Sequence, residues 1–293
     1  MDDKISSFKS DGFLHLNNIL DVKKCEDLYL KLKKKREWNY NLFQSEHAFK
    51  EEFKDNPKLK KTNPGKGIQN LVDEFDLDFI EKNSNIKKTL ISILGENYEI
   101  MLSKFVVAVP IEWMPNYLKK INQNTLISNF NPYIKKEYRD VTYFRGIDYH
   151  MDSIDWEDQD NHFITMYIYL NKVDKNMSPL NLIKQSHTYG HTSFPHYIKD
   201  HPAKDYLEYS PDNKNYKKFE KKMLIGDTGS VYFWTSNTLH GTAPSYSEKE
   251  DFRISLRYLI KKKSQISLLN DMLPTNKVGA TRVQKNKYKR ILT

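Results

Sequence analysis

The 293-residue sequence contains a single cysteine, Cys25, and few glycines or prolines. One cysteine excludes an intrachain disulfide and a cysteine-built metal site, and it favours a reducing, cytoplasmic setting. With 10 glycines and 11 prolines, the chain is neither collagen-like nor of low complexity. No apolar run approaches the roughly 20 residues that a membrane-spanning helix needs, and the polar start of the chain does not resemble a signal peptide. We therefore expect no membrane partner.

Aromatic residues and lysines are abundant instead. The aromatic fraction of 13% argues against a disordered chain, despite a mean hydropathy of -0.75. The 47 lysines and arginines outnumber the 38 acidic residues, which gives a net charge of +9. This charge is scattered and no nucleic-acid recognition motif accompanies it, so a nucleic-acid partner is not favoured. The excess of positive charge remains compatible with an anionic substrate.

The first hundred residues predict mostly helices. Asp21 can cap a helix that carries Val22, Cys25, Tyr29 and Leu32 on one stripe.

A second helix is predicted over 86–94. Ser84 or Asn85 can cap it, and Gly95 ends it. Between the two helices, the segment 46–67 is charged and contains proline and glycine, which predicts a surface excursion.

From about residue 98 the pattern changes to short runs rich in β-branched and aromatic residues. Helices followed by strands, without βαβ alternation, predict an α+β fold with helices packed on an antiparallel barrel or sandwich. We expect one domain over 1–265, with a helical part over 1–97 and a barrel over 98–262, and a basic extension over 266–293. The predicted strands are 100–109, 143–149, 163–170, 230–235 and 252–260.

Two segments carry side chains suited to metal binding. His150 and Asp152 stand two apart at a predicted strand end and so share a face, and His240 follows the strand over 230–235. Two imidazoles and one carboxylate form the facial set that binds Fe(II) and leaves the opposite coordination positions open for oxygen chemistry. Alone, His-x-Asp is a weak signal, and a polar strand end is the alternative.

Arg253 follows His240 by 13 residues, in a predicted strand. Alternation places Arg253 and Ser255 on one face, and a guanidinium facing a barrel interior needs an anionic partner. A dicarboxylate could supply that partner through a bidentate contact, with Ser255 as an added donor. Pairing with a protein carboxylate is the alternative.

Several ordered motifs resemble the phytanoyl-CoA dioxygenase family of Fe(II)/2-oxoglutarate oxygenases, over roughly 8–261. The segment 178–187 matches the family's "gPL..ipGSH" pattern, with Lys184-Gln185 in place of the usual Pro-Gly. The resemblance implies a double-stranded β-helix, that is, a jelly-roll or cupin-like barrel, with N-terminal helices packed against it. The other matching motifs are Phe8-x-x-x-Gly12-Phe13-Leu14, His150-x-Asp152, Gly226-Asp227, His240-Gly241-Thr242 and Arg253-Ile254-Ser255.

Carried over residue by residue, the resemblance implies that Fe(II), 2-oxoglutarate and O2 are the cofactor and co-substrates. It assigns the metal to His150, Asp152 and His240, which are also the catalytic residues. It assigns the distal carboxylate of 2-oxoglutarate to Arg253, assisted by Ser255 or Thr242, and makes Trp156 a residue of the same pocket. Family halogenases lack the carboxylate ligand, so the presence of Asp152 favours hydroxylation or a related oxidation such as desaturation.

Some parts of the chain depart from the family pattern. The loop 245–251 is extended, and Arg257 competes with Arg253 for the anchoring role. The two arginines stand about 13 Å apart along a strand, so both cannot hold one carboxylate. The segment 113–145 has no counterpart, and we interpret it as an insertion or lid whose Arg145 contacts co-substrate or substrate.

These observations predict an enzyme, an Fe(II)/2-oxoglutarate-dependent dioxygenase that hydroxylates a small metabolite and releases succinate and CO2. The excess of positive charge makes an anionic metabolite one candidate substrate. One alternative is an inactive cupin-like binding protein. Another is an oxygenase that acts on nucleic acid through the basic arm over 277–290. The sequence predicts neither the primary substrate nor the oligomeric state.

Overall fold

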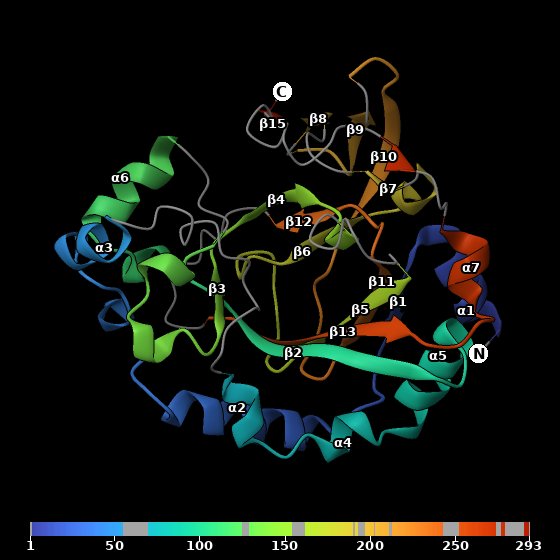
Figure 1. The fold of residues 1–293 in the computed structure, drawn as a ribbon, viewed down its shortest axis with the longest axis horizontal. Coiled ribbons are helices and arrows are strands. Elements are labelled where there is room, and N and C mark those ends of the chain that lie inside the picture. The colour runs from blue at the N-terminus through green and yellow to red at the C-terminus, as the bar shows by residue number, and fades with distance from the viewer. Residues whose placement is uncertain are drawn as a thin grey trace.

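The computed structural model describes the chain except for a set of short segments. Two β-sheets face each other, and helices cover the outer side of one of them (Figure 1). The described residues are 2–54, 70–124, 129–153, 162–189, 191–192, 197–201, 203–210, 213–242, 252–273, 277–278 and 290–292.

The six-stranded sheet has the order β1-β11-β5-β13-β2-β3, and the seven-stranded sheet has the order β15-β8-β9-β10-β6-β12-β4. Within these two sheets, neighbouring strands are antiparallel except in the pairs β2–β3 and β8–β15, and β7 and β14 form a separate parallel pair. The sheets curl around a shared interior, so the fold is α+β with a double-stranded β-helix, as the sequence predicted. The strands are β1 Phe13–Leu16, β2 Tyr98–Ala108, β3 Thr142–Phe144, β4 Ile147–His150, β5 Phe163–Tyr169, β6 Leu180–Ile183, β7 His191–Thr192, β8 Tyr197–Asp200, β9 Tyr206–Ser210, β10 Lys217–Met223, β11 Val231–Thr235, β12 His240–Thr242, β13 Ile254–Lys262, β14 Lys277–Val278 and β15 Arg290–Leu292.

The predicted strands correspond to β2, β5, β11 and β13, and to β3 and β4, which replace one predicted strand. The prediction missed β1, which lies within the supposedly helical part and pairs with β11. It also missed β10, whose sequence KKFEKKM has mostly exposed positions. An exposed strand with one buried residue gives too little apolar alternation to be recognised.

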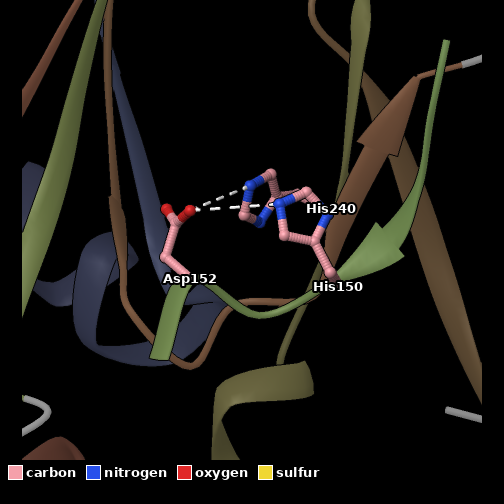
Figure 2. A group of neighbouring side chains, drawn as sticks. All are labelled: His150, Asp152 and His240. Atoms are coloured by element: carbon pink, nitrogen blue, oxygen red, sulfur yellow. Dashed lines mark ion pairs between the residues drawn. The ribbon is translucent and has the colours of Figure 1, made fainter. Parts of the chain in front are cut away.

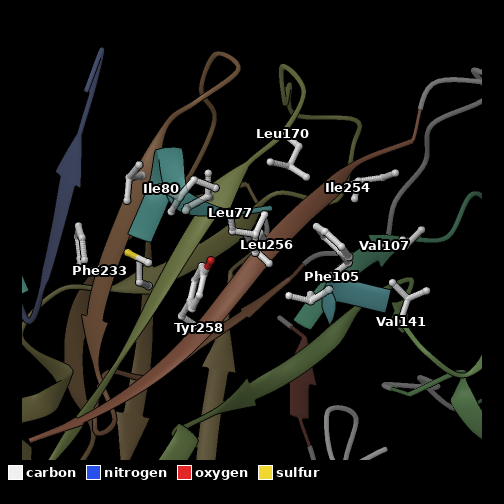
Figure 3. Close-up of a cluster of buried hydrophobic side chains, with 14 of the residues drawn as sticks. Leu77, Ile80, Phe105, Val107, Val141, Leu170, Phe233, Ile254, Leu256 and Tyr258 are labelled. Carbon is white, nitrogen blue, oxygen red and sulfur yellow. The ribbon is translucent and has the colours of Figure 1, made fainter. Parts of the chain in front are cut away.

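Successive residues of β2 and β13 point alternately into two different apolar layers. Phe105 and Leu256 are register partners and belong to the large cluster beneath the six-stranded sheet (Figure 3). Val106 pairs with Ser255 and belongs to the cluster between the two sheets, which also contains Leu182 of β6. Even-numbered β2 residues therefore face the barrel interior, and this alternation fixes which side chains can reach a site there.

Helices α2, α4 and α5 lie along the outer face of the six-stranded sheet (Figure 1). Short 3₁₀ turns at Tyr40–Leu42, Leu71–Glu74, Ile111–Trp113, Asn131–Tyr133, Lys136–Tyr138 and Ser186–Tyr189 join the elements. The helices are α1 Asp2–Asp11, α2 Val22–Lys34, α3 Glu46–Phe53, α4 Asp78–Glu81, α5 Ser84–Leu94, α6 Asn116–Asn124 and α7 Leu268–Met272.

Both predicted helices form, with local differences. Asp21 caps α2 by accepting from the Lys24 amide, as expected. Val22 was expected on the buried stripe, but it is 45% exposed. The stripe runs instead through Cys25, Leu28 and Leu32.

The cap of the second helix also differs from the prediction. Asn83 caps α5, rather than Ser84 or Asn85, because its side chain accepts from the amides of Asn85 and Ile86. Gly95 ends α5 with a φ of 85°, as predicted.

The surface excursion predicted over 46–67 was wrong for its first part. Residues 46–53 form α3, whose Phe49 stacks on Tyr133 at 4.5 Å between ring centroids. Glu52 of the same helix accepts two hydrogen bonds from Arg139. The segment 113–145 therefore packs against α3 through an aromatic contact and a part-buried ion pair, and it adds β3 to the main sheet. The rest of the excursion, 55–67, lies outside the described residues.

The C-terminal extension contains ordered contacts. Leu269 and Met272 of α7 belong to the main apolar cluster, although the extension was expected to begin at residue 266. Residues 290–292 pair as β15 with β8. Within the described part of the chain, every helix is too short or too polar to span a bilayer.

Candidate metal centre and co-substrate pocket

The β4–β12 pairing brings the three predicted metal ligands together. His150 and His240 are register partners on these antiparallel strands, so their imidazoles leave the same face. Asp152 follows β4 by two residues. One ligand atom from each of the three side chains lies within 4.8 Å of the other two (Figure 2).

His240 is held in the tautomer that suits a metal ligand. Its Nδ1 lies 2.9 Å from the carbonyl oxygen of Thr238, which accepts the ring proton and leaves the Nε2 lone pair facing Asp152. Burial lowers the pKa of His240 to about 3, although the Asp152 carboxylate partly opposes this effect. The ring is therefore neutral at physiological pH.

The two oxygens of Asp152 have different environments. Oδ2 accepts from the Thr165 hydroxyl at 2.6 Å and from Trp234 Nε1 at 3.2 Å. Oδ1 lies 3.7 Å from Nε2 of His240 and 4.0 Å from Nε2 of His150. Oδ2 is thus fixed by neutral donors, while Oδ1 faces the two imidazoles.

A cation also contacts Oδ1. Arg257 Nη2 on β13 donates to it at 2.6 Å. Burial alone would raise the pKa of Asp152, but Arg257, followed by His240 and His150, holds it well below its usual range. Asp152 is therefore ionised.

The donor set fits Fe(II). Two imidazoles and one ionised carboxylate lie together, and the carboxylate oxygen that faces the imidazoles is not used by Thr165 or Trp234. Thr165 and Trp234 orient the carboxylate, and Thr238 orients one imidazole, as outer-sphere partners of metal ligands do.

Arg253 lies directly before β13 and is buried, with 1% of its surface exposed. Its Nη1 donates to the Tyr167 hydroxyl at 2.6 Å and to Ser255 Oγ at 3.3 Å, and its Nε has no hydrogen-bond partner within the described part of the chain. The rings of Tyr167 and Tyr169 lie 5.6 Å and 5.9 Å from its Cζ. Among the described residues, no carboxylate pairs with Arg253. A buried guanidinium with an unused donor suits a dicarboxylate such as 2-oxoglutarate.

Other predicted site residues are placed less directly. Thr242 is buried on β12, two residues beyond His240 and so on the same face. Arg145 is buried next to β3, and its carbonyl accepts from Ser178 Oγ. Trp156 and the loop 245–251 lie outside the described residues.

The sequence reading missed the residues that surround the predicted ones. Thr165 and Tyr167 share the inner face of β5, and Trp234 lies on β11. Strand alternation could have placed Thr165 and Tyr167 on one face, but nothing in the sequence signals which strand faces Asp152. The sequence presents Arg257 only as a rival of Arg253, whereas the structure places it in contact with Asp152, a predicted metal ligand.

The chain belongs to the phytanoyl-CoA dioxygenase family, whose model matches residues 8–255. The protein is accordingly a dioxygenase that uses Fe(II), 2-oxoglutarate and O2, and its residues fit these groups. No curated protein sequence matches the chain.

Solved structures resemble this fold at low identity. The non-heme alpha ketoglutarate dependent carbocyclase SnoK from nogalamycin biosynthesis is 12% identical, with a TM-score of 0.48, over 94% of this chain and 92% of its own. EctD from S. alaskensis in its apoform is 12% identical, with a TM-score of 0.47, over 96% of this chain and 81% of its own. AviO1 from Streptomyces viridochromogenes is 10% identical, with a TM-score of 0.45, over 90% and 95% of the two chains.

Proposed function

We propose that the protein hydroxylates a small metabolite, with His150, Asp152 and His240 as the metal ligands. The observation that carries this proposal is the convergence of these side chains within 4.8 Å, on a barrel whose interior also holds Arg253. When bound, the iron supplies the oxidation of a substrate C–H bond at the expense of O2 and 2-oxoglutarate, with succinate and CO2 as products.

The side chains of this chain bind and orient the reactants. Asp152 supplies the negative charge of the ligand set through Oδ1, while Thr165 and Trp234 hold its other oxygen. Arg253 binds the distal carboxylate of 2-oxoglutarate and exchanges its contact with Ser255 for that carboxylate. The presence of Asp152 favours hydroxylation or desaturation over halogenation.

The wider assignment follows the sequence prediction. We assign the catalytic machinery to residues 1–265, and 266–293 add a basic extension whose helix α7 packs into the main apolar cluster. Thr242, Trp156 and Arg145 contribute to the pocket around the co-substrate or substrate. The single cysteine, buried in α2, supports a cytoplasmic location.

Anaerobic addition of Fe(II) and 2-oxoglutarate tests the proposal. The wild-type protein should develop a visible charge-transfer band, which should be absent in Asp152→Ala and His240→Ala and weakened in Arg253→Ala. His47→Ala, in the exposed part of α3, is the control and should retain the band. A band of equal strength in every variant would refute the assignment. Formation of succinate and CO2 by the aerobic wild-type protein distinguishes an oxygenase from an inactive binding protein.

A further inference from the structure

Two basic side chains project from neighbouring positions on the barrel's inner face, close to the proposed metal ligands. Arg257 on β13 and Lys104 on β2 are register partners. The pair lies two residues from Ser255 and Val106, which face the barrel interior, so Arg257 and Lys104 share that face. Tyr167 is the register partner of Arg257 on its other side. The interior thus has a row of one phenol and two basic groups across three strands.

The carboxylates near these two basic groups also serve other partners. Like charges directly opposite on adjacent strands repel each other. Asp152 accepts a hydrogen bond from Arg257. Asp140 and Asp73 act on the buried Lys104, but Asp140 also accepts two hydrogen bonds from Arg36.

Metal binding would change this balance. Oδ1 of Asp152 is the oxygen that faces both imidazoles and the one that Arg257 contacts. A divalent ion held by His150, Asp152 and His240 would compensate the carboxylate charge that now neutralises Arg257. The positive charges of the ion, Arg253 and Arg257 then exceed the negative charges of Asp152 and 2-oxoglutarate, before Lys104 is considered. In a barrel interior of low dielectric constant, such an excess favours binding of another anion.

We propose that Arg257, with Lys104 beside it, forms a subsite for an oxyanion of the primary substrate, a carboxylate or a phosphate. This inference rests on the proposed function and specifies its substrate class. Arg253 cannot serve the same group, because it lies four residues away along the strand, roughly 13 Å. Since Arg257 contacts a metal ligand directly, the carbon that is oxidised lies within a few bonds of the anionic group.

Titration calorimetry with simple oxyanions tests the subsite. Sodium sulfate is added to the full-length protein, anaerobically loaded with Fe(II) and saturated with 2-oxoglutarate, at constant ionic strength. Sodium acetate is titrated in a second arm, to separate phosphate-like from carboxylate-like recognition. Saturable binding is expected for at least one of the two anions.

Variants then locate the binding. The dissociation constant of the anion should rise at least tenfold in Arg257→Met and at least threefold in Lys104→Met. Arg257→Lys should keep an intermediate affinity because it retains the charge. Lys217→Met, on exposed β10, is the control and should bind as the wild type does. If Arg257→Met does not fold, Arg257→Lys and Lys104→Met still locate the site.

The outcomes separate the two proposals. An unsaturable titration, or equal affinities in all variants, overturns the subsite while the charge-transfer band leaves the oxygenase assignment intact. Absence of that band in the wild-type protein overturns the proposed function itself.

Discussion

Arg257 and His240 approach the same oxygen of Asp152, at 2.6 Å from Nη2 and 3.7 Å from Nε2. The guanidinium therefore stands beside the position that a metal ion needs. At an effective dielectric constant of about 20, two unit charges 4 Å apart interact by about 4 kcal/mol, and solvent reduces this at a partly exposed group. The interaction between Arg257 and a bound metal ion is repulsive.

Arg257→Met should consequently bind the metal more tightly. We expect the dissociation constant of Mn(II), measured by electron paramagnetic resonance of the free ion, to fall several-fold. Arg139→Met is the control, because Arg139 contacts Glu52 of α3 and not Asp152. Weaker Mn(II) binding in Arg257→Met would mean that the guanidinium positions Asp152 rather than competing for it.

The neutral donors on Oδ2 should act in the opposite direction. Thr165→Val and Trp234→Phe each remove one hydrogen bond that orients Asp152. Loss of such outer-sphere partners typically weakens metal binding by roughly 10–100-fold. Tyr232→Phe is the matched control, since its hydroxyl lies on the same strand as Trp234 but bonds the Ile225 carbonyl. Unchanged Mn(II) affinity in both variants would contradict this role.

Arg253→Met should lose 2-oxoglutarate while keeping the metal. Truncating one partner of a buried charge pair costs about 2–5 kcal/mol, so the dissociation constant of 2-oxoglutarate should rise by roughly 30-fold or more. Ser255→Ala should have a smaller effect, because its contact with Arg253 is long at 3.3 Å. Calorimetry on the Mn(II)-loaded protein measures both. Equal affinities in Arg253→Met and wild type would exclude Arg253 as the anchor.

His15 should make the fold sensitive to acid. Its ring stacks on Tyr232 at 4.1 Å between centroids, and burial, followed by Lys222 and Lys4, lowers its pKa to about 4. The unfolded chain therefore binds a proton at His15 before the folded chain does. The corresponding stability is present above pH 6.5 and is lost as the pH falls towards 4.

The variant His15→Phe keeps the stack and removes the titration. Its free energy of unfolding, from urea titrations at pH 7, 5.5 and 4, should fall less steeply than that of the wild type, by up to about 1.4 kcal/mol per pH unit. His47→Phe, in the exposed part of α3, should follow the wild type. Parallel pH profiles for His15→Phe and wild type would eliminate this contribution.

Gln185 occupies a backbone conformation suited to glycine. It stands where the family pattern has the glycine of Pro-Gly, and its φ is 62°. Gln185→Gly should stabilise the fold by about 1 kcal/mol, because non-glycine residues are strained in the left-handed region. Asn213→Gly, also at a φ of 62°, should gain less, since asparagine tolerates this region. Urea unfolding measures both, and a destabilised Gln185→Gly would show that its side chain matters more than its backbone.

The sequence predicted the parts of the fold that have strong local signals. Asp21 and Gly95 mark helix ends by hydrogen bonding and backbone freedom, which act within one turn. The central strands β5 and β13 are apolar enough to stand out. The residue types of the proposed ligand set could also be identified from the sequence, because few side chains suit Fe(II).

What the sequence could not predict depends on strand pairing. The contact between Arg257 and Asp152 joins residues 105 positions apart, and neither segment signals the other. Likewise, the exposed lysines of β10 give no strand signal, and the strand forms through its pairing with β6 and β9. The family pattern placed a glycine at position 185, and the chain keeps the glycine's backbone geometry without the glycine.

Gly12, near the N-terminus, supports the proposed metal ligand His240 through two successive hydrogen bonds. Gly12 has a φ of 81°, and a Cβ there would overlap the imidazole of His187, so only glycine allows this approach. The Gly12 carbonyl accepts from the Thr238 hydroxyl, and the Thr238 carbonyl accepts from His240 Nδ1. One imidazole of the ligand set is thereby anchored, through a single threonine, to the junction of α1 and β1. A fragment that begins after this junction would contain all three proposed ligands, but it would lack the hydrogen bond from Thr238 to Gly12 that helps to orient His240.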